Sequence, residues 1–421
     1  MILGFALAAV VMLLFAVPLF FVFGVSSAGI AIWGLNLPSH TLMQVSFDAM
    51  TKQVLVAIPI FVFAGSVMFH GGAARRLVDL AISAVGHLPG GLAVALILSI
   101  GVFSAISGSI LASIVAIGSV LMPPMIKAGY PKPFVIVLAA TAALIDALIP
   151  PSNTAIIYSA LTHVPVSKAF AAGILPGFVL MGLLLVFVMW KARHMPRPGR
   201  ASAAVRWRAF WMAIPALLLP VIILGGLYRG LLTPSESASV ASVYAAAMGA
   251  AVYRELTWVG LWKALRETAY TTTVIFAIIS MAVYFSVIMT YTRVPQDIVA
   301  FFLQYNIGPM TFMVLAGVAV LILGTFMEVV PVFYLAMPIF LPLCLALKVD
   351  LLHFYVFFTG LVGIGLITPP VCVGLYTAAA IVREPPQNAF RAVPGFVMIG
   401  LVYATIILFF PALATWLAAY W

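Results

Sequence analysis

The sequence predicts an all-α polytopic membrane protein made of two repeats. Of its 421 residues, 65% are hydrophobic and 7% are charged, and the mean hydropathy is +1.24. Because a helix needs ~20 mostly apolar residues to cross a bilayer, we expect roughly ten to twelve spans. Two further observations narrow the fold class, namely an internal repeat and a few polar residues that interrupt the apolar runs.

The internal repeat has a constant offset of 219 residues and needs no gap. It carries Pro123 to Pro342, and the pair Pro150-Pro151 to Pro369-Pro370. Proline kinks are common in membrane helices, but unrelated kinks would not keep one offset at distant positions. Matching interruptions in two hydrophobic halves are typical of secondary transporters with inverted repeats, whose site lies at the repeat interface.

The first repeat, residues 1–190, is expected to begin with scaffold helices. Residues 2–25 and 54–70 are apolar spans. The N-terminus lacks a basic segment and a small-residue cleavage signal, so the first span is not expected to be a removable signal peptide. The polar loop between the two spans carries His40, Asp48 and Lys52.

The rest of this repeat is expected to hold an arm, a hairpin and a broken helix. Residues 71–91 place charges opposite a helical apolar stripe, which predicts an amphipathic arm helix in the membrane interface. Residues from about 92 to 123 form two limbs around Ser107-Gly108-Ser109, each too short to cross, which predicts a re-entrant hairpin. Residues 133–160 could cross but are broken at Pro150-Pro151, which would free carbonyls for a cation and amides for an anion.

A basic linker, residues 191–208, separates the repeats. Six cations and no acid make it the strongest cytoplasmic marker in the chain. Since the cations of this chain cluster in a few short loops and form no basic face, its net charge of +10 does not indicate a nucleic-acid partner. The linker cations are Lys191, Arg193, Arg197, Arg200, Arg206 and Arg208.

The second repeat, residues 209–421, is expected to follow the same plan. Its loop Arg229–Glu236 is placed outside, and Trp416, Tyr420 and Trp421 are expected to form an interfacial belt. In chain order we expect an arm helix at 254–268 as the counterpart of 71–91, a span at 269–290, a hairpin at about 309–347, a broken helix at 351–382 and a C-terminal span from about Phe396.

Two carboxylates lie deep in apolar sequence, and such residues are functional candidates because their burial is unfavourable without a partner. Glu328 falls at the predicted tip of the second hairpin, where the offset places it opposite Ser109. It could pair with a cation, carry a proton or order the tip. Asp146 lies one helical turn before Pro150 and could cap the amides freed by the break.

Hydroxyl, amide and carbonyl oxygens gather around the interruptions, a donor set that suits a weakly bound alkali cation and no transition metal. The two cysteines, Cys344 and Cys372, are expected to be buried thiols. An intramembrane enzyme with a Ser107 nucleophile would need a base, and no His or Lys lies at matching depth nearby. The oxygen-bearing side chains are Ser104, Ser107, Ser109, Ser152, Asn153, Thr325 and Thr368.

Across essentially its whole length the chain resembles the large membrane subunit, DctM type, of tripartite ATP-independent periplasmic (TRAP) transporters. The resemblance implies a sodium-driven elevator in the bacterial inner membrane, without an organic cofactor. It implies a small four-helix membrane subunit, a periplasmic binding protein and an organic acid substrate such as a dicarboxylate. The motifs that carry it are Pro59-Ile-Phe-Val-Phe-Ala-Gly65, Gly71-Gly72, Arg75-Arg76, Ile106-Ser-Gly-Ser109, Ile149-Pro-Pro-Ser152, Gly324-Thr-Phe-Met327 and Gly365-Leu-Ile-Thr-Pro-Pro-Val371.

The same resemblance implies two sodium sites built largely from backbone oxygens. Substrate binding or coupling would fall to Ser104, Ser109, Asn153, Glu328 and Thr368. One sodium site would be lined by Ser107, Gly108, Ser109, Pro150, Ser152 and Asn153, and the other by Gly324, Thr325, Met327, Gly365, Thr368, Pro369 and Val371.

Three positions depart from the family pattern. Ser113 stands where an Asp commonly follows Ser-Gly-Ser, the second tip reads Glu328-Val-Val-Pro331, and Gly374 replaces an Asn. Fewer polar groups leave the ion and its stoichiometry open and would suit a less polar substrate, such as an aromatic acid. A stand-alone carrier coupled to protons or sodium, without a binding protein, stays an alternative, while a channel is disfavoured by the paired hairpins.

Overall fold

The computed structural model describes residues 8, 11–12, 15, 17–35 and 38–421. All regular secondary structure in these residues is helical, which confirms the predicted all-α class. Eight of their helices are long and apolar enough to cross a membrane, and three further apolar stretches are shorter. The chain is therefore a multi-pass membrane protein, with fewer clear spans than the roughly ten to twelve expected.

The first half differs from prediction at its polar loop, which is the helix α3 and not a loop. Much of the predicted span 2–25 lies outside the described residues. The helices of this half are α2 (Leu19–Gly29), a π-helical turn (Ile30–Gly34), α3 (Ser39–Met50), a 3-10 turn (Gln53–Val56), α4 (Ala57–His70), α5 (Ala73–Val85), α6 (Gly91–Ser107), α7 (Ile110–Lys127), α8 (Lys132–Ala142), a 3-10 segment (Ala143–Ala147), α9 (Asn153–Thr162) and α10 (Val166–Lys191).

The linker between the halves is shorter than predicted, because Arg206 and Arg208 already belong to α11. The second half contains α11 (Ala203–Tyr228), α12 (Pro234–Ala247), a π-helical turn (Met248–Val252), α13 (Trp258–Tyr291), α14 (Val294–Gln304), α15 (Pro309–Phe326), α16 (Val329–Ala346), α17 (Leu351–Ile367), α18 (Val373–Ile381), a 3-10 segment (Pro386–Ala392), α19 (Val393–Phe409), α20 (Ala412–Thr415) and a last 3-10 turn (Leu417–Tyr420).

The helix bounds repeat at the offset found in the sequence. Adding 219 to the bounds of α6 and α7 gives 310–326 and 329–346, which α15 and α16 match to within one residue. The bounds of α9 become 372–381, one residue from those of α18. Each of the four hairpin limbs is 17 or 18 residues long. That length is close to what a crossing needs, so their re-entrant course stays a prediction.

The helix that matches α5 in the second half is α14, so the assignment of residues 254–268 as the counterpart of 71–91 is wrong. The offset carries α5 to 292–304, where α14 lies. Most of the predicted arm forms the start of α13, a continuous helix of 34 residues that also includes the predicted span 269–290. Both α3 and α4 map onto α13, which therefore joins two elements that are separate in the first half.

Several helix ends are fixed by side chains. Thr233 and Glu236 form a capping box at the start of α12, in which Thr233 Oγ1 accepts from the Glu236 amide and the Glu236 carboxylate accepts from the Thr233 amide. Asp350 Oδ1 accepts from the amides of Leu352 and His353, both at 2.9 Å, and so caps α17.

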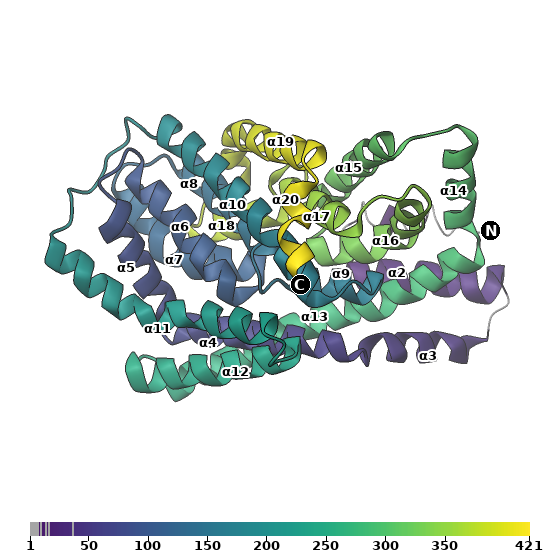
Figure 1. Ribbon diagram of the computed structural model, residues 1–421, viewed down its shortest axis with the longest axis horizontal. Helices are drawn as coiled ribbons and strands as arrows, with labels where there is room; N and C mark the ends of the chain where they lie inside the picture. The colour runs from purple at the N-terminus through teal and green to yellow at the C-terminus, as the bar shows by residue number, and fades with distance from the viewer. Residues whose placement is uncertain (1–7, 9–10, 13–14, 16, 36–37) are drawn as a thin grey trace.

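The helices form a scaffold layer and a second layer of hairpins and broken helices. Figure 1 shows α13 running along one side of the molecule near α3 and α4. Within this layer α4 packs against α12 and α13, and α13 packs against α2 and α3. In the other layer α6 packs against α7, α15 against α17, and α17 against α19.

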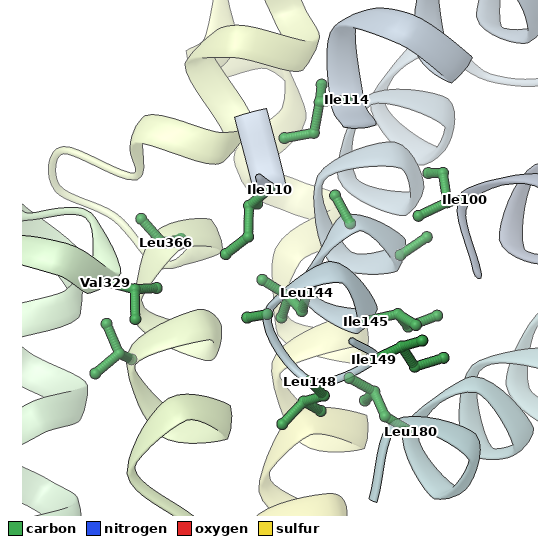
Figure 2. Close-up of a cluster of buried hydrophobic side chains, with 14 of the residues drawn as sticks. Ile100, Ile110, Ile114, Leu144, Ile145, Leu148, Ile149, Leu180, Val329 and Leu366 are labelled. Atoms are coloured by element: carbon green, nitrogen blue, oxygen red, sulfur yellow. The ribbon is translucent and has the colours of Figure 1, made fainter. Parts of the chain in front are cut away.

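The two repeats share one apolar core where the hairpins meet. Figure 2 shows Ile110 and Leu144 of the first half near Val329 and Leu366 of the second. These four side chains are at most 5% exposed. Close van der Waals packing of these side chains therefore holds the two breaks next to each other.

Candidate functional site

The first hairpin break forms because only glycine fits its centre. Ser107 ends α6, Gly108 has a φ of +63°, and Ser109 is the N-cap of α7. A Cβ on Gly108 would lie 2.9 Å from the carbonyl oxygen of Pro151. The backbone N–H of Asn153 donates a hydrogen bond to the Gly108 carbonyl at 3.2 Å, and this bond connects the hairpin to the broken helix. The predicted residues of the first site are thus brought together, although 39 or more residues separate the two segments in sequence.

Asp146 joins this group, in a role that the sequence did not predict. Its Oδ1 accepts a hydrogen bond from Ser107 Oγ at 2.9 Å, and that hydroxyl also bonds Ser113 Oγ at 2.8 Å. The predicted capping role is wrong, because the N-cap of α9 is Ser152 and no side chain caps that helix. Asp146 is fully buried, and its Oδ2 has no hydrogen-bond partner in the described part of the chain.

A second unpaired oxygen lies at the same break. The amide oxygen of Asn153 is buried without a hydrogen-bond partner among the described residues. Ser152 Oγ donates to the Ala147 carbonyl at 2.9 Å, and Tyr355 donates to the same carbonyl at 3.3 Å. Pro150 is buried beside them. These two oxygens are among the buried side-chain atoms that have no partner in the described residues, and a hydrogen-bond donor or a cation at this break would satisfy them.

The second break has a related shape. The backbone N–H of Cys372 donates to the Thr325 carbonyl at 3.0 Å. The offset carries the donor Asn153 to Cys372 but the acceptor Gly108 to Met327, so the acceptor here lies two residues earlier than in the first half. Gly324 and Gly365 lie in close contact, since a Cβ on Gly324 would be 3.2 Å from the Gly365 Cα. Met327 is buried, whereas Val371 is 42% exposed.

The hydroxyls at this second break donate to their own helices. Thr325 Oγ1 bonds the Ile322 carbonyl and Thr368 Oγ1 bonds the Ile364 carbonyl, both at 2.8 Å. Each oxygen keeps lone pairs for a cation, as does the carbonyl of the half-buried Pro369. The offset carries Asp146 to Gly365, so the second break has no carboxylate at the matching position.

A cleft of about 480 Å³ lies between the scaffold and the hairpin tips. Its walls are helical stripes of α4, α7 and α13, together with residues near both tips. Ser109 and Glu328, two of the predicted substrate or coupling residues, line it. The full lining is Val62, Gly65, Ser66, Phe69, Phe103, Ser107, Ser109, Leu111, Ala112, Val115, Ala116, Glu267, Tyr270, Thr271, Val274, Ile275 and Glu328.

The other predicted substrate residues do not line this cleft. Ser104 is fully buried in α6, where its hydroxyl donates to the Gly101 carbonyl at 2.7 Å. Asn153 and Thr368 lie at the two breaks, behind the tips. Asn153 and Thr368 therefore do not face the cleft, whereas Ser107 and Ser109 belong both to the first break and to the cleft lining.

A polar cluster on the scaffold was missed by the sequence analysis. Glu267 of α13 accepts from Ser66 Oγ at 2.6 Å, and its two carboxylate oxygens lie 3.1 Å from His70 Nε2. Ser66 and His70 stand one turn apart on α4. The prediction of an interfacial arm at 254–268 had placed Glu267 at the membrane surface, and only the spacing of Ser66 and His70 hinted at a shared partner.

Comparison with known proteins places the chain in a family. The family model described as "Tripartite ATP-independent periplasmic transporter, DctM component" matches residues 6–413. The chain belongs to this family. The resemblance inferred from the motifs is thereby confirmed, and the DctM components that the chain is similar to are transporter permeases.

Among these DctM proteins, the chain is 36% identical over 371 residues to the "C4-dicarboxylate TRAP transporter large permease protein DctM" of Pseudomonas aeruginosa, with 87% of each chain covered. It is 31% identical over 415 residues to the "Ectoine/5-hydroxyectoine TRAP transporter large permease protein UehC" of Ruegeria pomeroyi, covering 98% of this chain and 97% of that one. The solved structure of the Alcanivorax borkumensis YdaH transporter shares the fold, with a TM-score of 0.62 at 17% identity over 98% of this chain and 97% of that one.

Proposed function

We propose that this DctM component is the large membrane subunit of a sodium-coupled importer of small organic acids in the bacterial inner membrane. A periplasmic binding protein would deliver the solute, and a small four-helix subunit would complete the membrane part. The observation that carries the sodium assignment is the pair of unpaired buried oxygens at the first break, on Asp146 and Asn153.

The first break fits sodium by its chemistry. Its donors are oxygens only, from the Asp146 carboxylate, the Asn153 amide, hydroxyls and carbonyls freed by the breaks. A buried carboxylate is unfavourable unless a cation or a proton compensates its charge. Sodium supplies that charge and takes several oxygen ligands, as hard cations do.

The second break fits a more weakly held sodium. Its oxygens are neutral and come from Thr325, Thr368 and backbone carbonyls. Without a carboxylate at the position matching Asp146, its attraction for a cation is smaller. We therefore expect two sodium ions that bind with different affinity.

The cleft between scaffold and tips supports alternating access by an elevator motion. One wall belongs to α4 and α13, and the other to the hairpins that hold the proposed sodium sites. A sodium ion that orders a tip would also shape the cleft wall through Ser107 and Ser109. This connection gives a physical route for coupling ion binding to solute binding.

The partners follow from the family. Exposed aromatic side chains on α11 and α13, such as Trp207, Trp211, Trp258 and Trp262, offer an apolar surface for lipid or for the small subunit. The isethionate relative of Oleidesulfovibrio alaskensis, named DctMQ, is longer than this chain, which covers 64% of it.

A proton-coupled, stand-alone carrier is the second candidate. Glu328 supports it, because this carboxylate sits at a tip and lines the cleft. The two candidates differ in which cation gradient drives uptake and in whether a binding protein is needed.

Reconstitution in proteoliposomes tests the proposal. The chain would be combined with the small subunit and binding protein encoded beside it, and uptake of a panel of radiolabelled organic acids would be measured. We expect uptake to need both the binding protein and an inward sodium gradient. Uptake driven by a proton gradient in potassium medium, or uptake without the binding protein, would favour the stand-alone carrier.

A further inference from the structure

The polar lining of the cleft is acidic. Glu267 and Glu328 line it from opposite walls, and none of its lining residues in the described part of the chain is a Lys or an Arg. Sites that hold carboxylates usually offer a guanidinium or an ammonium group. The lining of this cleft therefore opposes a solute that carries only negative charge.

Glu267 is held in place by the scaffold and keeps its charge exposed. Ser66 and His70 fix the carboxylate, yet the Glu267 side chain is 54% exposed. His70 pairs with Glu267 and can carry a positive charge, and Lys263 stands one helical turn before Glu267 on α13, but neither residue is part of the cleft lining. A charged His70 would offset one carboxylate and would leave the charge of Glu328.

Glu328 has no side-chain partner among the residues that the structure describes. It is half-buried at the N-cap of α16, and its carboxylate forms no hydrogen bond or ion pair with the described side chains. A carboxylate that leaves water without a partner is unfavourable. An occupant that donates hydrogen bonds or carries positive charge would remove this penalty.

The remaining lining suits the same kind of occupant. Aromatic rings of Phe69, Phe103 and Tyr270 contribute to the walls, and ring faces attract organic cations. The volume of about 480 Å³ lies in the range of small-molecule sites, about 300–1,000 Å³.

We propose that the organic acid carried by this chain bears a positively charged nitrogen in addition to its carboxylate, and that Glu267 and Glu328 select it. The inference rests on the proposed function in one respect, that a solute enters this cleft. The rival explanation is that sodium ions at the two breaks neutralise the cleft and admit a plain dicarboxylate. The two explanations predict opposite charge preferences when sodium is bound.

Thiol labelling measures the charge preference directly. Thr271 lines the cleft, so Thr271→Cys places a thiol in it, and the parent chain is the blank because Cys344 and Cys372 are fully buried. The full complex in nanodiscs would be treated with a trimethylammonium-ethyl or a sulfonato-ethyl methanethiosulfonate. Each rate would be divided by the rate of the same reagent with free 2-mercaptoethanol, in saturating sodium and in potassium.

We expect the cationic reagent to react faster by about tenfold or more in both salts, as expected for a cleft of one charge sign. Glu267→Gln and Glu328→Gln should each reduce this ratio at least about threefold. Asp297→Asn is the matched control, because Asp297 is exposed on α14 away from the cleft, and it should leave the ratio unchanged. The proposal would be overturned if the ratio of cationic to anionic labelling rates were near one, or if both Gln variants left that ratio unchanged. It would also be overturned if the anionic reagent reacted faster in sodium.

Protection of the same thiol tests the solute class. Pairs that differ by one ammonium group would be compared at 10 mM, namely phenylalanine with 3-phenylpropionate and aspartate with succinate, within a wider panel of zwitterions and nitrogen-free acids. Protection should be stronger for solutes with the charged nitrogen. Protection by nitrogen-free acids alone, or by neither class, would contradict the proposal. If sodium did not drive uptake but the thiol still reacted faster with the cationic reagent, the proposed sodium coupling would be rejected. The inference about the charge of the solute would remain supported.

Discussion

At the first break, Asp146 is a buried carboxylate whose charge has a direct consequence for stability. It is fully buried, one of its oxygens is bonded to Ser107 and the other is unpaired among the described residues. A neutral side chain of the same shape would remove the buried charge and would keep the bond to Ser107. A substitution of Asp146 by Asn therefore tests the effect of its charge without changing how the side chain packs.

Asp146→Asn should make the protein more stable in potassium and less responsive to sodium. The charge is uncompensated without a cation and forms a ligand with one. A tenfold weaker sodium affinity would reduce the stabilisation at saturating sodium by about 1.4 kcal/mol. The measurement is thermal unfolding in sodium against potassium at equal ionic strength.

Asp297→Asn, which removes an exposed charge on α14, is the control and should behave as the parent does. An unchanged sodium response in Asp146→Asn would exclude this carboxylate as a ligand.

Among the helices, α5 is held to the segment before α13 by an ion pair and a cation–π contact. Arg76 Nη2 lies 2.6 Å from Glu255 Oε1, and the guanidinium stacks over the Tyr253 ring at 4.6 Å. Gly72 has a φ of +84°, and a Cβ there would clash with the Glu255 carboxylate. The glycine before α5 therefore permits the ion pair.

This ion pair should make part of the free energy of unfolding depend on pH in the acidic range. The hydrogen bond from Arg76 lowers the pKa of Glu255, although partial burial opposes the shift. Because the pKa of Glu255 is lower in the folded protein than in the unfolded chain, the ion pair stabilises the fold fully when the pH is above the unfolded-state pKa. This stabilisation is lost as the pH falls through the folded-state pKa. From about pH 6 to about pH 3 the parent should lose more stability than Glu255→Gln.

The difference should stay below about 1 kcal/mol, because the Glu255 side chain is 42% exposed. Chemical unfolding followed at several pH values checks it. Parallel pH curves for parent and variant would show that the pair adds nothing to stability.

At the scale of the whole molecule, the scaffold and the first hairpin meet at a glycine. A Cβ on Gly65 of α4 would lie 3.1 Å from the Cα and 3.3 Å from the Cβ of Ser107. That spacing is tighter than ordinary van der Waals contact. Any side chain at position 65 would therefore push the first tip away from the scaffold, and a large side chain would push it furthest.

Gly65→Leu should hinder the approach of the two layers. We expect a destabilisation of about 1–3 kcal/mol from overpacking and a fall in sodium-driven uptake of at least tenfold, roughly the factor that a 1.4 kcal/mol bias against one state produces. Uptake in proteoliposomes and thermal unfolding are the two measurements. Gly182→Leu on α10 is the control, because a Cβ there would meet nothing within 4 Å. Normal uptake by Gly65→Leu would show that this contact does not change during transport.

The membrane class, the offset between the two halves and the positions of the helix breaks could all be predicted from the amino-acid sequence. Composition, proline and glycine act locally, so the offset of 219 predicts where α15, α16 and α18 lie. The same local reasoning failed at 254–268, because an amphipathic pattern looks alike in an interfacial arm and in the first turns of a long helix such as α13.

Which polar side chains contact one another could not be predicted and depends on how the helices pack. The bond between Asp146 and Ser107 joins residues 39 apart, and the contact of Glu267 with Ser66 joins residues 201 apart. Neither pairing leaves a periodic signal, because it depends on how helices pack and not on the order of residues along one helix. The acidic character of the cleft, and with it the proposed solute class, follows from that packing.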